Sequence, residues 1–530
     1  MKPQKYPVRR LWLVVSLFLA FLLVMQIPWS RNHRTNSGVS RSFAPNGDEI
    51  RTADGRVDYL ATSNSLASRD LLPADNAAVD YVRLIGLEKL SSDPQFIADF
   101  CALLGVDRMS VENTTPLTPT WRKFWRERHL RSNSNAELPN DDYERMMGGQ
   151  WTATDFPDAA KVFDELQPGI ESIRAATLKR RYFHPLVGSR TPALKLAQPT
   201  MMSALLPLTQ ELREFARVLA MDAMYQVGKG NSARAMEDVF AMHRLADQLS
   251  NGQCLIECLV GNAVSGIANA TAITLINAGT FDESQLTAYA KFLEDNPLNI
   301  RSSNVVDRGE RYMGLDVLQM MDRDGLSYFG IMASNTGNST AGDSTASGWA
   351  IANRFVDWGA ALEVVNMHYD ELVQVLKAAE DSQVHDDLGE FKSKLSDSGY
   401  YTIGGVLQAI LSPSIRGSQQ ADFLLRQLIP AIEAINSSNS RSRAQRDALR
   451  LIVALGRYRI RNQSLPKTLD DLAPEFIAVI PLDRFTGQPF RYLSDNTGYS
   501  VTSSGRDRQF GASATSTGID DIEYRIDLRQ

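Results

Sequence analysis

Cysteine is scarce in this sequence of 530 residues, which contains only Cys101, Cys254 and Cys258. Three cysteines are too few for a disulfide framework, so the fold is not expected to depend on one. Cys254 and Cys258 are four residues apart in an apolar stretch, which would place them on one helix face. We interpret them as buried core residues, because free cysteine is commonly buried and a metal site would need more ligands. Glu257, although adjacent in sequence, is expected to point to another side of the helix.

An excess of basic residues is also missing. The chain has 56 Lys and Arg against 62 Asp and Glu, and its pI is near 5.7. A nucleic-acid-binding body would normally show a basic patch or stripe, so nucleic acid is not an expected partner. A body of roughly 450 residues is too large for one compact core, so we expect two or three domains.

Familiar catalytic motifs are absent as well. The sequence has no Gly-x-Ser-x-Gly elbow, no His-Glu-x-x-His and no phosphate-binding Gly-Lys-Ser/Thr loop. His243 and Asp247 are one helical turn apart, which we interpret as a local hydrogen bond in preference to a catalytic dyad. Asp307 and Glu310 form a carboxylate pair without distinguishing context. No catalytic residue and no cofactor-binding residue is therefore predicted.

One long apolar run stands near the N-terminus, from Leu11 to Ile27, and only Ser16 and Gln26 interrupt it. As a helix it would span roughly 26 Å, close to the bilayer core of about 30 Å. Residues 11–29 are therefore predicted to be a transmembrane anchor. The small residues of a signal-peptide cleavage site are missing after the run, so we expect an uncleaved anchor, with a cleaved signal peptide as the alternative.

The residues that flank this run indicate its orientation. Four basic residues precede it, so residues 1–10 are predicted to stay in the cytoplasm and the bulk of the chain to face the periplasm or exterior. The predicted location is thus the inner (cytoplasmic) membrane, spanned once. Residues 30–72 are rich in Ser, Asn, Arg and Gly and are predicted to be a flexible tether. The four basic residues are Lys2, Lys5, Arg9 and Arg10.

Residues 73–435 show helical periodicity and are predicted to be a helical body. Asp75 or Asn76 can cap a helix that begins at Ala77, and a second helix is expected over Pro94 to Leu104. The clearest signal covers Leu205 to Ala278, where three helices separated by short turns with glycine predict stacked helical hairpins. The first of these carries a stripe with 3, 4, 3, 4 spacing: Leu205, Leu208, Leu212, Phe215 and Leu219.

Residues 330–348 are Gly, Ser, Thr and Asn with few apolar residues, and they predict a loop insertion in this body. A further amphipathic helix is expected from about Ala350 to Ala379. The body is thus predicted to contain helices throughout, interrupted by this insertion.

Residues 440–530 change character and predict a separate α+β module. A helix over Ala444 to Asn462 is followed by stretches in which apolar and polar residues alternate, the pattern of a half-buried strand. Thr486-Gly487 and Thr497-Gly498 are expected turns between strands. The alternating apolar residues are Phe490, Tyr492, Tyr499 and Val501. The predicted fold class is therefore mainly α, a helical-hairpin body with a small C-terminal α+β module.

The order of motifs in this module resembles the soluble half of the major pseudopilins of type II secretion. The motifs are the Tyr458-Arg459 pair, Leu465-Pro466, the block from Pro481 to Tyr492, and the stretch from Gly498 to Asp507. The whole chain resembles uncharacterised bacterial families in which a membrane anchor and a helical body precede such a module. Unlike pseudopilins, the chain has no processing site before its apolar run and no glutamate inside it, so we do not expect a pilus subunit.

The resemblance also implies calcium as a possible ligand, because the corresponding pseudopilin loop binds it. By position the oxygen donors would be Asp507, Asp520 and Asp521, with main-chain carbonyls near residues 503–505. Calcium takes six to eight oxygen ligands, and this loop offers several. Arg506 and Arg508 oppose a cation, and a solvated polar loop is the alternative interpretation.

Two hypotheses of function follow. The first is a non-enzymatic, membrane-anchored envelope protein with a protein-interaction or scaffold role, whose partners are the membrane and other envelope proteins. The second is an envelope hydrolase with a site in the helical body that no motif reveals. A deep pocket with converging acid, base or metal ligands would favour the hydrolase, and a broad groove or apolar patch would favour the interaction protein.

Overall fold

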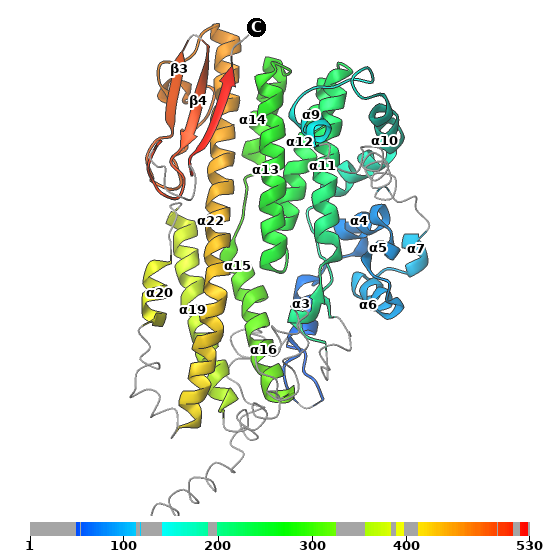
Figure 1. Ribbon diagram of the computed structural model, residues 1–530, viewed down its shortest axis with the longest axis vertical. Helices are drawn as coiled ribbons and strands as arrows, with labels where there is room; N and C mark the ends of the chain where they lie inside the picture. The colour runs from blue at the N-terminus through cyan, green and yellow to red at the C-terminus, as the bar shows by residue number, and fades with distance from the viewer. Residues whose placement is uncertain are drawn as a thin grey trace, which may run out of the picture.

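The computed structural model describes residues 49–53, 55–112, 117, 140–188, 199–324, 356–382, 388–396, 412–495, 497–511 and 520–527. This part of the chain is mainly helical and carries a small three-stranded antiparallel sheet near its C-terminal end. Figure 1 shows an elongated molecule in which α22 (Pro413–Asn462) runs along most of the long axis. A mainly α fold with a small C-terminal sheet is thus confirmed. The predicted anchor, residues 11–29, and the predicted insertion, residues 330–348, lie outside the described residues.

The first part of the fold contains several short helices, one of which begins at a predicted cap, Asn76. Asn76 accepts a hydrogen bond from the Ala78 amide at the start of α4 (Ala77–Ile85), and Asp93 caps α6 (Pro94–Leu104). Such side chains satisfy first-turn amides that lack a partner within the helix. The neighbouring elements are α3 (Tyr59–Ala67), η2 (Pro73–Asp75), α5 (Leu87–Leu90), α7 (Arg108–Glu112), α9 (Asn140–Gly148) and α10 (Pro157–Thr177).

Three long helices form the centre of the molecule: α11 (Pro207–Gly228), α12 (Ser232–Ser250) and α13 (Leu255–Asn277). Each packs on the other two, so the predicted pair of helical hairpins is confirmed. Leu205, the first residue of the predicted stripe, lies before α11, whereas the remaining side chains from Leu208 to Leu219 are at most 1% exposed, as expected for a helix face that contacts its neighbours. Before α11 the chain forms β1 (Val187–Gly188), η4 (Met201–Ser203) and β2 (Ala204–Leu205).

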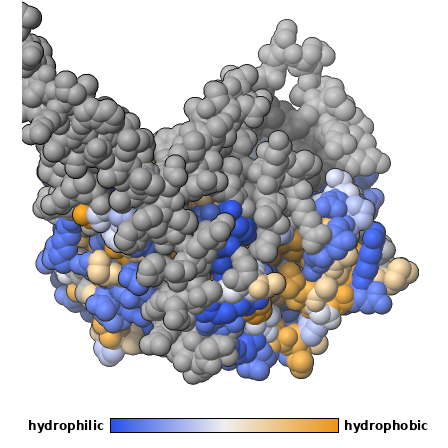
Figure 2. Space-filling view, turned by 90° about the horizontal axis from the view of Figure 1, so that it is seen from below, coloured by the Kyte–Doolittle hydropathy of each residue, from blue (hydrophilic) through white to orange (hydrophobic). Residues whose placement is uncertain are grey.

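Two large hydrophobic cores and one small third cluster are found in the described part of the chain. The first is built from α4, α10 to α13, α14 (Glu283–Asp295), the C-terminal half of α22 and the sheet. The second is built from α3, the N-terminal half of α22 and five further helical elements. These are α15 (Ser302–Val305), the π-helix η5 (Val306–Glu310), α16 (Arg311–Asp324), α19 (Trp358–Ser382) and α20 (Gly389–Ser396). The described part of the lower end shows hydrophilic and hydrophobic areas side by side (Figure 2).

The C-terminal sheet has the order β3-β4-β5, and both strand pairs are antiparallel. Phe490, Tyr499 and Val501 are buried in the first core together with Leu449 of α22, so the predicted matching faces of helix and sheet do meet. Gly487 has φ of +69°, the left-handed conformation that the predicted turn requires. The bounds are β3 (Arg491–Asp495), β4 (Gly498–Ser503) and β5 (Ile522–Asp527), with η7 (Leu469–Leu472) between helix and sheet.

The predicted boundary between the helical body and the C-terminal module, at residues 435–440, does not interrupt the helix. The helix predicted to start at Ala444 is the last part of α22, which is continuous through residues 435–440. Polar residues in this stretch contact α13: the Asn262 side-chain amide donates to Asn439 at 2.7 Å and to the Ser438 hydroxyl at 3.0 Å. Tertiary contacts of this kind override the weak helix preference of Ser and Asn.

Part of the predicted tether is folded. Within residues 30–72, α3 occupies Tyr59–Ala67, and the Tyr59 side chain is 2% exposed. Asn64 exchanges two hydrogen bonds with the main chain of Leu186, at 2.8 and 2.9 Å. A polar composition suggested disorder here, but these polar groups are satisfied by partners far away in the sequence.

Candidate functional site

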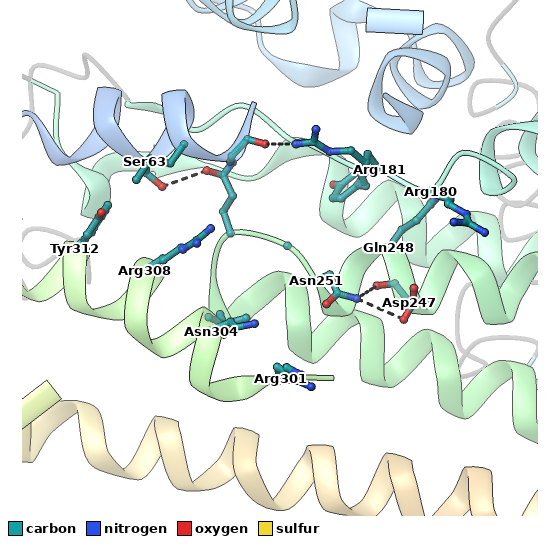
Figure 3. Close-up of a pocket in the computed structure, with 16 residues that line it drawn as sticks. Ser63, Arg180, Arg181, Asp247, Gln248, Asn251, Arg301, Asn304, Arg308 and Tyr312 are labelled. Atoms are coloured by element: carbon teal, nitrogen blue, oxygen red, sulfur yellow. Dashed lines mark hydrogen bonds between the residues drawn. The ribbon is translucent and has the colours of Figure 1, made fainter. Parts of the chain in front are cut away.

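A pocket of about 370 Å³ opens where the two cores meet. Its walls come from α3, the segment after α10, the turn between α12 and α13, and the chain from Arg301 to Tyr312 (Figure 3). Clefts of roughly 300–1,000 Å³ between packed units are common sites for small ligands. The pocket is therefore the strongest candidate for a binding site in the described part of the chain.

The lining of this pocket is rich in arginine. Asp247, at the end of α12, is the one carboxylate among the lining residues. Its main-chain carbonyl accepts a hydrogen bond from the Asn251 side chain at 2.8 Å. Burial raises the pKa of Asp247, and the Arg446 guanidinium opposes that rise. Against this single acid stand four arginines: Arg180, Arg181, Arg301 and Arg308.

The four guanidinium groups differ in how they are held. Arg181 donates to the main-chain carbonyls of Arg69 and Ala67, at 2.9 and 3.2 Å. Arg301 makes a long contact of 3.4 Å with the side chain of Asn299. Within the described ranges, Arg180 and Arg308 have no hydrogen-bond or ion-pair partner.

The charged residues that directly precede these two arginines in sequence are paired with other residues. Asp307, which precedes Arg308, pairs with Arg311 at 2.5 Å, and neither of the two lines the pocket. Lys179, the neighbour of Arg180, pairs with Asp80. The pocket therefore carries a net positive charge that neighbouring acids do not neutralise.

The π-helix η5 sets the position of Arg308. It joins α15 to α16, and its Gly309 lies against the turn between α12 and α13. A Cβ atom on Gly309 would be 2.3 Å from the Gln253 carbonyl oxygen, so only glycine allows this close approach of the two backbones. Single π-helical turns occur frequently at functional sites. Here the turn places Arg308 beside the pocket and Glu310 in the core.

A buried polar cluster lies directly behind the pocket. The Glu257 side chain is 0% exposed; its carboxylate accepts a hydrogen bond from the Gln253 amide at 2.7 Å and contacts His184 Nδ1 at 3.2 Å. The Cys254 thiol donates to the same carboxylate at 3.9 Å. The prediction that Glu257 points away from Cys254 is wrong, because Cys254 is the extended N-cap residue and helical spacing begins only at Leu255.

The cysteines of this cluster lack the character of nucleophiles. Cys254 is 5% exposed and Cys258 is 0% exposed, so their predicted burial is confirmed. Burial and the Glu257 carboxylate raise the pKa of the Cys254 thiol well above its ordinary value. A reactive cysteine needs the opposite, a lowered pKa and access to solvent.

Two further predictions about titratable groups are corrected. His243 contacts the Tyr289 hydroxyl at 2.8 Å, and no hydrogen bond joins it to Asp247 among the described residues. Glu310, interpreted from sequence as unremarkable, is 6% exposed and accepts a hydrogen bond from the Leu255 amide at 3.4 Å. Burial raises the pKa of Glu310 to about 7.

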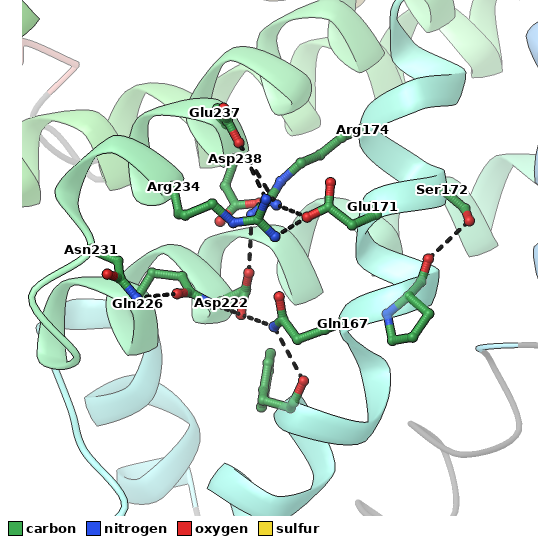
Figure 4. A network of polar contacts seen from close by, with 12 residues as sticks. Gln167, Glu171, Ser172, Arg174, Asp222, Gln226, Asn231, Arg234, Glu237 and Asp238 are labelled. Carbon is green, nitrogen blue, oxygen red and sulfur yellow. Dashed lines mark hydrogen bonds and ion pairs between the residues drawn. The ribbon is translucent and has the colours of Figure 1, made fainter.

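A second arginine cluster is enclosed between α10, α11 and α12 (Figure 4). The Arg174 guanidinium donates to Asp238 at 2.8 Å and to Asp222 at 3.2 Å, and both aspartate side chains are 0% exposed. Gln167 donates to the other oxygen of Asp222 at 2.7 Å. Burial raises the pKa of both aspartates, and for Asp238 the nearby Asp222 charge adds to the rise. These closed contacts join three helices and leave no access for a ligand.

The three predicted calcium ligands lie in one loop region of the C-terminal sheet. Asp520 accepts hydrogen bonds from the amides of Arg506 and Asp507, at 2.5 and 3.2 Å, and faces Arg441 at 3.4 Å. The Asp507 and Asp521 carboxylates each accept a main-chain amide as well. In the described part of the chain, no three His, Cys, Asp or Glu residues are grouped to hold a metal. The loop thus offers a cation few unoccupied oxygens, and calcium stays a prediction.

Asp483, in contrast, has a role that the sequence did not indicate. Its side chain is 0% exposed and accepts hydrogen bonds from the Ser503 hydroxyl at 2.8 Å and from the Ser504 amide and hydroxyl at 2.9 and 2.8 Å. A buried carboxylate needs such partners to offset its lost hydration. Asp483 therefore fastens the turn before β3 to the end of β4.

In comparisons with known proteins, no protein-family model, curated protein or solved structure matches this chain. Among the described helices, α13 is long and apolar enough to cross a membrane, but 67% of its most apolar window is buried inside the fold. It also carries the buried Glu257 at its first turn. Both properties are typical of a core helix.

Proposed function

We propose that this chain is a membrane-anchored, non-enzymatic envelope protein whose folded body binds other molecules on the periplasmic side. The observation that carries the proposal is the character of the pocket: four arginines line it, and of its described hydroxyl and carboxylate groups Ser63 is bonded to Gln253 and Asp247 to Asn251, not to each other. Catalysis by an acid, a base or a nucleophile requires such groups within reach of a bound substrate. Here His184 and Glu257 are fully buried behind the wall.

The N-terminal apolar run and the C-terminal module support the anchored, interacting role. Residues 11–29 have the length and flanking charges of a single membrane span. The pseudopilin-like motifs of residues 440–530 suggest contact with other envelope proteins. Leu482 and Leu493 are about half exposed, at 50% and 52%, and offer apolar contact points on this module.

Protease accessibility tests the orientation. Protease added to spheroplasts that contain the full chain should degrade the body and leave a short fragment that retains a tag at the N-terminus. A cytoplasmic marker protein serves as the control for intact membranes. A fully protected body, or a soluble processed form in the periplasm, would contradict the proposal.

Chemical cross-linking followed by purification from solubilised membranes tests the interaction role. We expect cross-linked partners that are lost from the double variant Leu482→Lys and Leu493→Lys, because charged residues would weaken an apolar contact. The variant Lys291→Ala, at an exposed position of α14, is the matched control. If the same partners are captured by all three chains, the module does not form the contact surface.

The hydrolase is the second hypothesis, and purified chain tests it. Ester, peptide and glycoside substrates should remain intact with both the unaltered chain and His184→Gln. Turnover that His184→Gln abolishes, in a variant with unchanged circular dichroism, would establish the hydrolase instead.

A further inference from the structure

The pocket between the two cores assembles positive charge that the fold does not balance. Arg180, Arg301 and Arg308 reach it from two separate parts of the chain, residues near 180 and residues near 305. All three side chains are exposed, so each keeps its hydration without a ligand and remains available to an anion that enters the pocket. The buried Arg174 is paired with aspartates, whereas the pocket arginines are exposed and line the pocket with a single aspartate.

Arginine in particular indicates the chemistry of the occupant. Its planar guanidinium donates pairs of parallel hydrogen bonds that match the oxygens of phosphate or carboxylate groups. Three such groups against one aspartate favour an anion with more than one negative charge. A phosphate group meets that requirement better than a single carboxylate.

From this arrangement we propose that the pocket binds a phosphate-bearing small molecule or headgroup, with Arg301 and Arg308, from one segment of the chain, contacting the phosphate and Arg180 lying at the opposite edge of the lining (Figure 3). The proposal does not depend on the membrane anchor or on the scaffold role, since it rests on the pocket alone. Arg181, which is already bonded to main-chain carbonyls, supports the wall. Asn304 and Ser63 also line the pocket, and they offer polar groups to the part of the ligand beyond the phosphate.

Asp247 provides a second test, in which the expected change in affinity is opposite to that for the arginines. As the one carboxylate in the lining, it repels an anion and limits the affinity. The variant Asp247→Asn keeps the size and hydrogen-bonding capacity of the side chain and removes its charge. Binding of a phosphate should therefore become tighter in this variant, whereas removal of an arginine should weaken it.

Isothermal titration calorimetry with the full, detergent-solubilised chain and inorganic pyrophosphate measures this directly. We expect saturable binding with a stoichiometry of one, weakened about tenfold or more by Arg308→Gln or Arg301→Gln and tightened by Asp247→Asn. The control is Arg145→Gln, which removes one positive charge from an exposed site outside the pocket. Thermal unfolding of each variant, recorded by circular dichroism, verifies that the compared chains are folded.

A second experiment with lipid vesicles distinguishes a soluble phosphate compound from a lipid headgroup. Pyrophosphate binding that phosphatidic acid vesicles do not compete indicates a soluble phosphate compound. Binding to phosphatidic acid vesicles and not to phosphatidylcholine vesicles, weakened by Arg308→Gln, indicates a lipid headgroup. Absence of binding in both arms, or equal weakening by Arg308→Gln and Arg145→Gln, would overturn the proposal.

Discussion

Arg174 and Arg180 are close in sequence but belong to two different arginine clusters. The first cluster is buried and paired with aspartates, whereas the second is exposed and lines the pocket. Arg174, near the end of α10, is 7% exposed and is surrounded by Asp222 and Asp238. Arg180, six residues later, is exposed and has no partner among the described residues. A buried charge must be paired inside the protein, because its hydration is lost on folding. An accessible charge keeps its water and remains available for a ligand.

The comparison separates charges that stabilise the fold from charges that serve binding. Removing Arg174 leaves two enclosed aspartates without their cation, whereas removing Arg308 leaves nothing unpaired. The two classes should therefore differ strongly in their effect on the free energy of unfolding. Four substitutions test this difference, from the largest expected effect to the smallest.

Arg174→Leu should destabilise the protein by about 3–5 kcal/mol, the usual range for breaking a buried ion pair from one side. Denaturant unfolding followed by circular dichroism measures the change. Arg145→Gln is the control for loss of a positive charge at the surface. A loss below about 1 kcal/mol would show that the cluster at Arg174 is not structural.

Glu310 sharpens the comparison because it is a buried acid, 6% exposed, whose pKa is raised to about 7. The folded protein holds this proton more tightly than the unfolded chain, in which the pKa is near 4.5. The stabilisation is therefore fully present below pH about 4.5 and is lost as the pH rises through about 7. It amounts to roughly 3 kcal/mol across that range.

Glu310→Gln removes this titration and keeps the shape of the side chain. The free energy of unfolding of the unaltered protein should fall relative to that of the variant between pH about 4.5 and 7. Denaturant titrations at four or five pH values measure the difference. Parallel profiles for the two proteins would show that Glu310 does not titrate in this range.

Asp238→Asn should destabilise the protein far less than Arg174→Leu, by about 1 kcal/mol. The cluster holds two aspartates against Arg174; burial raises the pKa of both, and the Asp222 charge adds to the rise for Asp238. The variant keeps Asp222 as a partner for the guanidinium. Equal losses from Asp238→Asn and Arg174→Leu would mean that both aspartate charges are needed.

Arg308→Gln should change the free energy of unfolding by less than about 0.5 kcal/mol, as for most surface substitutions. Its side chain has no partner among the described residues, so no buried group is left unpaired. Thermal unfolding without ligand measures this. A decrease in the free energy of unfolding above about 2 kcal/mol would show that Arg308, like Arg174, stabilises the fold.

The helices and the pocket differ in how well the sequence predicts them. The bounds of α6 and the buried stripe of α11 follow from capping residues and from apolar spacing, which are local properties. The pocket is built by residues as far apart as Ser63 and Tyr312, and no local pattern relates them. His184 and Glu257 meet for the same reason only in the folded protein.

The errors also have a physical cause. The Ser and Asn residues near Asn439 suggested a boundary, but contact with Asn262 of α13 keeps α22 helical there. Asn64 suggested part of a tether, but its side chain is bonded to Leu186. In both cases a polar residue is satisfied by a distant partner, and composition alone does not reveal such partners.

The continuity of α22 has a structural consequence. Fifty residues of unbroken helix measure roughly 75 Å, at about 1.5 Å per residue. One end is clamped in the second core, and the other end carries the C-terminal sheet in the first. The sheet at one end and the helices packed on the other end are therefore joined by one continuous element, so the two cores are linked through α22 itself.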